Sequence, residues 1–598
     1  RTGRWIVALG ALAAWAAWAC SAAGCSAKSS TAFSERDGFQ CDGGLCVPAD
    51  ATPNLTVATC DSQGGTAPVQ APTLVKTISG TGTAWFASPA IIDLDGDGKM
   101  ELVATTYDVF VMDATGKELS RIKTDQYHKG RVYAPAVIAD LDGDGIVEIV
   151  VGGSECTVAA YEYKGGTLSI KKGWPVKACL PEDKSVEVRG MAAADLDGDG
   201  TIEIVVTTTQ DGDGAQVYVY RPNGELYQPQ GLSGYDAWPR YNRQTGLGGD
   251  LDANGCGHSG YGAYGLNVAI GNIDNDPQLE IIVTYDNHHI QAFKHDGTAI
   301  LSSPFFSNRS SECDGARMSW GQFIRWLDPE IEKQHYSLHK GEWPSPTTAI
   351  WLQWTASPPV VADLDGDGLN EVIGIPNAEM NEPYQTQFFP FVVYYGAHDP
   401  QLSAMRFPGF ERPPTSGAPQ KRPSGWYPPD GIPAPTVVDI LGDSRPEIVA
   451  ALNDGYIHAI NPDGTIAWKY DYRHGRDLLY ASEVVVADLN RDGKPELLFT
   501  TWGVPKDSKA GYLVILDGAG TLLHDIPLTV GTNGNGAGYP AAPTVGDLDG
   551  DGELEIVIQS FGAGMQIWRV PGSGTQCLLW PTARANYLRN AIGPGYSR

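Results

Sequence analysis

The sequence predicts an all-β fold: a β-propeller of about eight four-stranded blades, with insertions in the middle blades. A β-rich unit recurs from residue 88 onward, and each copy has an acidic loop between two apolar runs. Turn residues are frequent, with 72 Gly and 41 Pro among 598 residues. Repeats of short strands are typical of propellers. Seven blades plus one irregular unit is the alternative that the repeat spacing leaves open.

The clearest copy of the unit is residues 88–103, in which the loop DLDGDGKME separates two apolar runs. Further apolar runs follow this loop up to residue 122, so one unit supplies four antiparallel strands. A strand near 74–78 or near 577–580 is expected to close the ring of blades. Eight such loops, each with Glu eight residues after its first position, begin at Asp93, Asp140, Asp195, Asn272, Asp363, Asp439, Asp488 and Asp547.

The residue types in these loops predict calcium sites. Side-chain oxygens at the first, third, fifth and ninth positions can converge on one hard cation, and glycines at the fourth and sixth positions allow the tight bend. Calcium accepts such an irregular oxygen shell, whereas magnesium needs a strict octahedron. An EF-hand is excluded because its twelfth position would be Ala104 and the flanking runs have strand character. A single acidic loop could be only a surface turn. Eight loops with the same final Glu favour calcium.

About six calcium ions are expected, and up to eight if every loop binds. The loop at Asn272 has Pro277 in place of its sixth glycine, so its occupancy stays open, and the loop at Asp439 has Leu441 and Ser444, so it is expected to be empty or to bind weakly. The candidate metal ligands, which include the backbone carbonyl of Lys99, are Asp93, Asp95, Asp97, Lys99, Glu101, Asp140, Asp142, Asp144, Glu148, Asp195, Asp197, Asp199, Glu203, Asn272, Asp274, Asp276, Glu280, Asp363, Asp365, Asp367, Glu371, Asp488, Asn490, Asp492, Glu496, Asp547, Asp549, Asp551 and Glu555.

The pattern Asp-x-Asp-Gly-Asp-Gly-x-x-Glu between two strands resembles the FG-GAP or VCBS repeats of bacterial surface proteins, which are related to the propeller head of integrin α chains. The resemblance covers most of residues 71–598 and implies a calcium-binding propeller domain over that range. It carries little information about ligand or activity, because propellers host many functions.

The N-terminal residues predict export. Arg1 and Arg4 precede an apolar run, and small residues lead to Cys25, so residues 1–25 are expected to be a signal peptide with a lipobox-like end. Cys25 is the expected lipid-bearing residue, although Ala22 departs from the usual Leu, and cleavage near Ala23 without a lipid is the alternative. The run is too short to span a membrane. A cell-surface or outer-membrane lipoprotein is therefore expected, with a secreted or periplasmic protein as the alternative.

Residues 26–70 are expected to form a Ser/Thr/Gly-rich stalk with a small disulfide knot between Cys41 and Cys46. Disulfides are expected in an exported chain with an even number of remaining cysteines. Sequence proximity suggests the pairs Cys156–Cys179 and Cys256–Cys313. Eight cysteines allow many connectivities, so the pairing stays open.

Composition and the absence of catalytic motifs narrow the range of possible functions. The net charge of -29 argues against nucleic acid, because phosphate contacts need clustered Lys and Arg. The sequence has no GxSxG elbow, no Walker loop and no Cys/His nucleophile pair, which disfavours an enzyme.

The middle insertions concentrate aromatic residues such as Trp238, Trp351 and Trp426, which could stack on sugars, anchor a protein partner or simply pack on the blades. The preferred hypothesis is a non-enzymatic, calcium-stabilised extracellular binding or adhesion module for a glycan or protein. The alternatives are an extracellular polysaccharide lyase or other glycan-active enzyme, and a structural component of an envelope assembly.

Overall fold

The computed structural model describes eleven stretches of the chain. These are residues 39–42, 45–48, 58–179, 185–209, 217–227, 268–300, 352–353, 357–375, 377–378, 392–395 and 433–593, with short gaps at 275, 286–288, 298–299, 367, 453, 477–478, 504–508, 510 and 534–535. Over this part of the chain every regular element is a β-strand. No helix there is long and apolar enough to cross a membrane. Cys25, the Cys256–Cys313 pair, Asp367 and nearly all of the aromatic insertions lie outside the described residues.

The chain divides into two compact units, residues 1–54 and residues 55–598. In the first unit the structure describes one antiparallel hairpin, formed by β1 (Phe39–Asp42) and β2 (Leu45–Pro48). Its register places Cys41 opposite Cys46. This pairing is the one that the predicted disulfide knot requires, and the bond itself stays a prediction.

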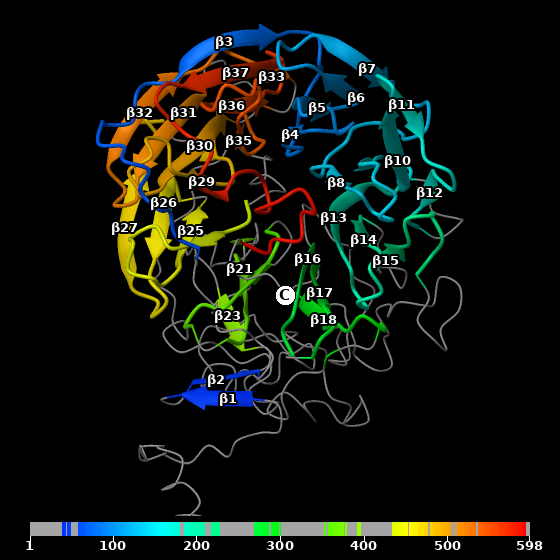
Figure 1. Cartoon of the computed structure of the whole chain (residues 1–598), viewed down its shortest axis with the longest axis horizontal. Coiled ribbons are helices and arrows are strands. Elements are labelled where there is room, and N and C mark those ends of the chain that lie inside the picture. The colour runs from blue at the N-terminus through cyan, green and yellow to red at the C-terminus, as the bar shows by residue number, and fades with distance from the viewer. Residues whose placement is uncertain are drawn as a thin grey trace, which may run out of the picture. The chain divides into compact units, whose positions relative to one another are not determined.

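The second unit is an all-β propeller made of antiparallel sheets (Figure 1). Eight of its sheets each contain one acidic loop, and that loop always joins the first two strands. In chain order, the first four of these sheets are β4 (Ala90–Ile92), β5 (Glu101–Thr105), β6 (Val109–Met112) and β7 (Glu118–Ile122); β8 (Val137–Ala139), β9 (Glu148–Gly152), β10 (Thr157–Lys164) and β11 (Thr167–Ile170), with β12 (Val176–Lys177) on β10; β13 (Val188–Ala194), β14 (Glu203–Thr208) and β15 (Tyr218–Tyr220); and β16 (Val268–Gly271), β17 (Glu280–Tyr285) and β18 (His289–Phe293).

The other four sheets follow the same order. They are β20 (Val360–Ala362), β21 (Glu371–Gly374) and β23 (Val392–Tyr395); β24 (Thr436–Val438), β25 (Glu447–Ala451), β26 (Tyr456–Ile460) and β27 (Ile466–Asp471); β29 (Val485–Ala487), β30 (Glu496–Gly503), β31 (Tyr512–Asp517) and β32 (Leu522–Pro527); and β35 (Thr544–Gly546), β36 (Leu554–Gln559), β37 (Met565–Val570) and β3 (Thr73–Ile78). Short strands extend the edges: β19 (Leu352–Gln353) pairs β22 (Asn377–Ala378), and β28 (Leu479–Ala481), β33 (Thr532–Asn533), β34 (Gly536–Gly538) and β38 (Leu578–Trp580) join the sheet of β30.

The expectation of about eight four-stranded blades, or seven, is wrong. Among the described residues six blades are complete: five have four regular strands, and in the sixth Leu226 bridges Tyr220 beside β15. The sheets that begin with β16 and β20 have three strands each in the described part. The missing positions fall next to the long insertions, where the regular spacing of the repeat is lost.

The ring closes through two segments that are distant in sequence. β3 pairs with β37 as the outer strand of the last sheet, with Thr73 opposite Arg569 and Ile78 opposite Met565. Figure 1 shows this blue strand beside the red one. The strand near 74–78 therefore closes the ring, as expected. The other candidate, β38, pairs instead with the inner strand β29.

The second strand of each blade is apolar on both faces because it is sandwiched between neighbouring blades. Every residue of β5, β9, β14, β25 and β36 is buried. The outer strands β7, β27 and β32 are half exposed. This gradient from the axis to the rim explains why the inner runs read as continuous apolar stretches and the outer runs alternate.

Residues 577–592, here called the plug segment, lie against the inner strands (Figure 1). Backbone N–H groups of the inner strands donate to carbonyls of this segment, and the acceptors include those of Pro581, Tyr587 and Leu588. The Tyr587 hydroxyl also bonds both backbone groups of Ile91, and Arg589 Nε donates to the carbonyl of Ala136 at 2.9 Å. The plug segment thus ties inner strands from separate blades to each other.

Two disulfides are described. Cys156–Cys179 is the bond suggested by sequence proximity. Cys60–Cys577 joins residues 517 positions apart and fixes the start of the plug segment to residues that the sequence assigned to a stalk. Those residues also bond the propeller directly, since the N–H groups of Gln63 and Gly65 donate to the carbonyl of Arg491.

Candidate metal centres

Each acidic loop folds around the side chain at its first position. In the first loop Asp93 Oδ1 accepts the N–H of Gly96 at 2.8 Å, and Asp93 Oδ2 accepts that of Gly98 at 2.9 Å. The same pair of bonds occurs in the loops at Asp195, Asp363, Asp439, Asp488 and Asp547. The first aspartate therefore organises the loop backbone as well as offering oxygens.

The glycines at the fourth and sixth positions take the left-handed conformation that the tight bend needs. Gly96 and Gly98 have φ of 72° and 83°. In two loops a residue other than glycine takes this shape: Arg491 has φ of 65° and Ser444 has φ of 69°. The loops at Asp439 and Asp488 therefore keep the same turn at the cost of one strained residue each, whereas Pro277 in the loop at Asn272 cannot take this conformation.

The glutamate at the ninth position is buried in all eight loops. It begins the second strand, and its Oε2 accepts the N–H of the residue at the second position, as Glu101 does from Leu94 at 2.9 Å. In seven of the loops burial raises the pKa of this glutamate, and neighbouring carboxylates raise it further; these residues are Glu101, Glu148, Glu203, Glu280, Glu447, Glu496 and Glu555. The pKa rises to about 7 in Glu203 and Glu447 and to about 8 in Glu280 and Glu496. A positive ion beside these groups would relieve the conflict between burial and charge.

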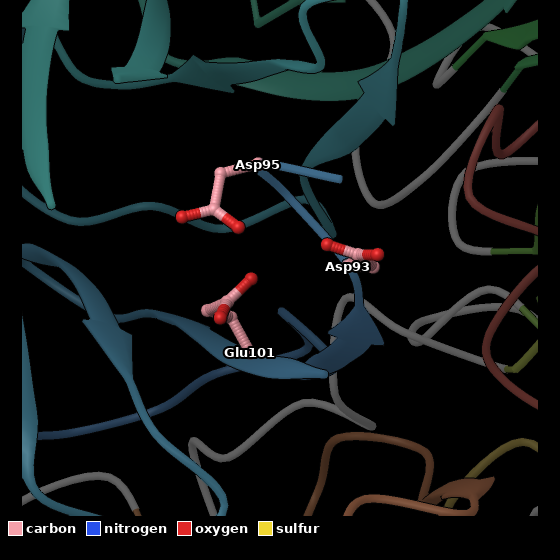
Figure 2. Close-up of side chains that lie close together, drawn as sticks. All are labelled: Asp93, Asp95 and Glu101. Atoms are coloured by element: carbon pink, nitrogen blue, oxygen red, sulfur yellow. The ribbon is translucent and has the colours of Figure 1, made fainter. Parts of the chain in front are cut away.

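At least five loops bring three carboxylates together, with one oxygen of each residue within 4.8 Å of the others. Figure 2 shows Asp93, Asp95 and Glu101 converging in this way. The predicted ligands at the first, third and ninth positions thus meet in the first loop, while Asp97 turns to Lys99. Five of these groups are Asp93, Asp95 and Glu101; Asp140, Asp142 and Glu148; Asp195, Asp197 and Asp199; Asp274, Asp276 and Glu280; and Asp363, Asp365 and Glu371.

Two loops that the sequence marked as irregular have a buried carboxylate oxygen without a hydrogen bond. Glu280 Oε1 and Glu447 Oε1 are both fully enclosed and find no hydrogen-bond partner among the described residues. In the first of these loops Asn272 Nδ2 donates to the carbonyl of Asp276, so the side-chain amide of Asn272 is hydrogen-bonded within the loop itself. A buried oxygen left in this way is a ready acceptor for a cation.

Several loops contain a basic side chain from elsewhere in the same blade. Lys171 Nζ lies 2.8 Å from Asp142 Oδ2 and 2.9 Å from Glu148 Oε1. Arg221, Lys294 and Arg569 occupy the corresponding place in the loops at Asp195, Asn272 and Asp547. Sequence reasoning missed all four, because each lies at least 14 positions from its loop glutamate and only strand register brings it back.

The loop at Asp488 is covered by residues 60–67. Asn490 Nδ2 donates to the carbonyl of Ala67 at 3.2 Å, and its Oδ1 accepts the N–H of Asp492. Asp488 and Glu496 are 2% and 4% exposed. Among the described residues no Lys or Arg side chain pairs with the carboxylates of this loop, so they form an uncompensated acidic cluster.

A second feature lies at the strand ends opposite the acidic loops. This aromatic cluster consists of Trp85, Phe86, Tyr133, Trp502 and Phe561, with ring centroids 5.2 to 6.4 Å apart in each touching pair. Within the part of the chain that is described, neither Trp85 Nε1 nor Trp502 Nε1 has a hydrogen-bond partner.

A guanidinium group lies on the aromatic cluster. Arg131 stands 4.2 Å above the ring centre of Trp85 and pairs with Glu187 at 2.6 Å. The aromatic residues of the cluster come from segments more than 400 positions apart, so no local sequence pattern marked them.

Comparison with known proteins supports the fold. Residues 140–206 match the model of an FG-GAP-like repeat. No curated protein matches the chain.

Among solved structures, the exotype rhamnogalacturonan lyase YesX is 16% identical with a TM-score of 0.46, covering 87% of this chain and 80% of its own. The V. cholerae biofilm matrix protein Bap1 is 15% identical with a TM-score of 0.36, and the match covers 89% of this chain and 97% of Bap1. Saccharomyces cerevisiae Sqt1 is 11% identical with a TM-score of 0.43, covering 84% and 99%. These likenesses are too distant to carry an argument about the site. The chain is a β-propeller that contains an FG-GAP-like repeat.

Proposed function

We propose that this protein is a calcium-stabilised, non-enzymatic binding module that acts outside the cell. The observation that carries the proposal is the set of eight acidic loops, each with a buried glutamate at the start of the second strand of its blade. Carboxylates gathered at such positions repel each other, so a bound cation stabilises the folded state. The metal is in the first place structural.

The donor set fits calcium. In the first loop the ion would be held by Asp93, Asp95 and Glu101, with Asp97 and the Lys99 carbonyl within the same loop. All are hard oxygen donors, and no thiolate or imidazole takes part. The enclosed Oε1 of Glu447 is a further acceptor without a hydrogen-bond partner among the described residues. The ion would supply charge neutralisation and cross-link the first two strands of a blade.

The two described disulfides support an extracellular location, since such bonds persist in oxidising compartments. The proposed export signal at 1–25 and lipidation at Cys25 agree with this location. A cell-surface protein with a propeller whose axis is filled by its own plug segment would meet partners on its faces.

The aromatic cluster is the proposed contact surface, and a glycan is the partner that its chemistry favours. Flat rings such as Trp85 stack on sugar faces. Trp85, Phe86 and Arg131 are partly exposed, and the guanidinium over Trp85 adds a positive charge that favours hydroxyl or carboxylate oxygens. The aromatic insertions predicted to serve this purpose lie outside the described residues.

Calcium binding is tested by stripping the full chain with EGTA and titrating calcium back while following thermal unfolding and counting bound ions. Each site filled at 100 times its Kd adds about 2.7 kcal/mol to the free energy of unfolding. We expect a large rise in Tm with calcium and a much smaller one with magnesium. An unchanged melting curve together with no bound calcium would reduce the loops to surface turns.

The calcium-loaded protein and its Trp85→Ala variant are then passed over immobilised neutral and acidic oligosaccharides. Retention of the wild type and loss of the variant, with unchanged Tm, supports a glycan surface. Capture of a protein alone would favour a protein partner, and release of unsaturated sugars would identify a lyase.

A further inference from the structure

One strand position in each blade lies opposite the loop glutamate. On the third strand, Arg569 pairs in register with Glu555, Glu162 with Glu148, Tyr395 with Glu371, and Asp517 with Glu496. Continuing the printed registers by one residue places Asp113, Arg221, Lys294 and Asn461 at the same position in the other four blades. This opposite position therefore differs in charge from blade to blade while the loops stay nearly alike.

In three blades the opposite position is basic, and its side chain reaches into the loop. Arg569 Nη2 lies 3.1 Å from Asp551 Oδ2, and its Nε lies 3.1 Å from Glu555 Oε1. A further ion pair joins Arg569 to Asp549. One guanidinium thus contacts the carboxylates at the third, fifth and ninth loop positions.

The other two basic residues repeat this arrangement. Arg221 Nη1 lies 3.2 Å from Asp199 Oδ2 and 3.6 Å from Glu203 Oε1, while its Nη2 lies 3.8 Å from Asp197 Oδ2. Lys294 pairs with Asp274 and lies 3.1 Å from Asp276 Oδ2. The third and fifth loop positions are paired with a protein-borne positive charge in all three blades.

Two blades have an acidic residue at the opposite position, and among the described residues no basic side chain from another strand pairs with the carboxylates of their loops. Asp517 and Asp113 bind backbone N–H groups of the following turns. In the first loop Lys99 pairs only with Asp97, and its side chain is 79% exposed. The loop at Asp140 is intermediate, because Glu162 at the opposite position is balanced by Lys171 from beyond the fourth strand.

We propose that the residue opposite the loop glutamate decides which loops take calcium: a basic residue there acts as a tethered cation that replaces the ion. This inference rests on the proposed calcium binding. In the loops at Asp195, Asn272 and Asp547 the chain itself supplies one positive charge, and Lys171 does the same at Asp140. Loops at Asp93 and Asp488 depend on the metal. The wild type then binds no more than about four calcium ions, at the loops without a tethered cation, rather than the six expected from loop sequence alone.

The test removes one tethered cation and adds another. Arg569→Met keeps the aliphatic stem and frees the loop at Asp547, so the full chain should bind about one more calcium ion and have a lower Tm in EGTA. Asp517→Lys places a cation opposite Glu496 and should cost about one ion. Arg121→Met is the matched control, because Arg121 pairs with Asp108 and Glu118 away from the loops. Its bound calcium should equal that of the wild type.

Bound calcium is counted by elemental analysis after dialysis against a weak chelator, and Tm is recorded with and without calcium. An unchanged count in both Arg569→Met and Lys294→Met, or six or more ions in the wild type, overturns the tethered-cation rule while leaving calcium binding in place. No calcium in the wild type or any variant overturns the proposed function together with the rule. A gain in the Met variants and a loss in Asp517→Lys establishes both.

Discussion

At the scale of single residues, Glu483 is the carboxylate that offsets two buried arginines of the plug segment. Its Oε1 accepts the indole N–H of Trp580 at 3.0 Å and the backbone N–H of Arg584 at 2.6 Å. Arg584 and Arg589 are 2% and 1% exposed. Burial lowers the pKa of each of these two arginines to about 10, and the charge of Glu483 acts in the opposite direction.

Glu483→Gln removes the charge while keeping the shape of the side chain. Two guanidinium groups would then stay buried without their carboxylate, and we expect a loss of about 3 kcal/mol in the free energy of unfolding. Urea unfolding in saturating calcium measures it. Glu225→Gln, at an exposed position, should stay within about 0.5 kcal/mol of the wild type. Equal effects of the two variants would contradict this account.

The sequence was sufficient to place the loop residues, because their chemistry is local. The pattern of glycines determines where the backbone turns. The Glu at the ninth position is the carboxylate that becomes buried, because it begins the second strand. It was not sufficient for Arg221, Lys294 and Arg569, since their contribution depends on the register between strands. A shift of one residue would turn each side chain to the other face of the blade.

At the scale of elements, the segment between β7 and β8 is held by a buried histidine. His128 is fully buried, with Nδ1 hydrogen-bonded to the Tyr161 hydroxyl at 2.9 Å and Nε2 to the Tyr107 carbonyl at 2.7 Å. One nitrogen donates and the other accepts, so the neutral ring fits this pair of partners. Burial lowers the pKa of His128 below 6.5, partly opposed by the bond to the Tyr107 carbonyl.

Stability should therefore fall in mild acid through this residue. The unfolded chain binds a proton near pH 6.5 and the folded chain only at lower pH, so the contribution is complete above pH 6.5 and is lost as pH falls from there toward the folded pKa. The slope is at most about 1.4 kcal/mol per pH unit. His128→Gln should be less stable at pH 7.5 and have a flatter decline between pH 7 and 5 in urea unfolding.

His524→Gln serves as the comparison, because His524 is partly exposed on β32 and bonds a single carbonyl, that of Val69. It should keep the acid slope of the wild type. If His128→Gln has the same slope as well, the acid sensitivity comes from another group.

The positions of the strands were largely predictable from the sequence, but the number of strands in each blade was not. Short runs bounded by turns such as Asp113-Ala114-Thr115-Gly116 gave strands close to those observed in the first blade. The error in blade count arose in the middle of the chain, where insertions separate the loop-bearing hairpin from its outer strands. The number of acidic loops gives the number of loop-bearing hairpins. It does not give the number of complete blades, because a complete blade needs four strands.

At the scale of the whole molecule, the two disulfides constrain very different lengths of chain. Cys156–Cys179 encloses 23 positions within one blade, whereas Cys60–Cys577 spans 517. In the loop-entropy model, bond removal costs about 3 kcal/mol for a loop of the first size and about 5 kcal/mol or more for the second.

Replacing both cysteines of each pair by serine tests this difference in urea unfolding. Cys60→Ser with Cys577→Ser should lose more stability than Cys156→Ser with Cys179→Ser. It should also weaken calcium binding at the loop beneath residues 60–67. The reverse ranking would mean that local packing near Cys156 outweighs the constraint on the ring.

Fold class followed from the repeats, and ring closure by β3 was one of two options in the sequence. The Cys60–Cys577 bond and the course of the plug segment were beyond reach, because cysteine positions alone do not select a connectivity. Residues such as Tyr587 and Arg589 have no periodicity that would reveal contacts with several blades.

The plug segment has a consequence for the order in which the protein can fold. Its residues leave the ribosome only after every blade has been made, yet they supply hydrogen bonds that the inner strands need. β3, in contrast, is made before all the blades but pairs with β37. A growing chain therefore cannot finish the propeller one blade at a time, and its axis is completed only after synthesis has passed residue 592. Such distant pairings between residues far apart in the sequence make folding slow.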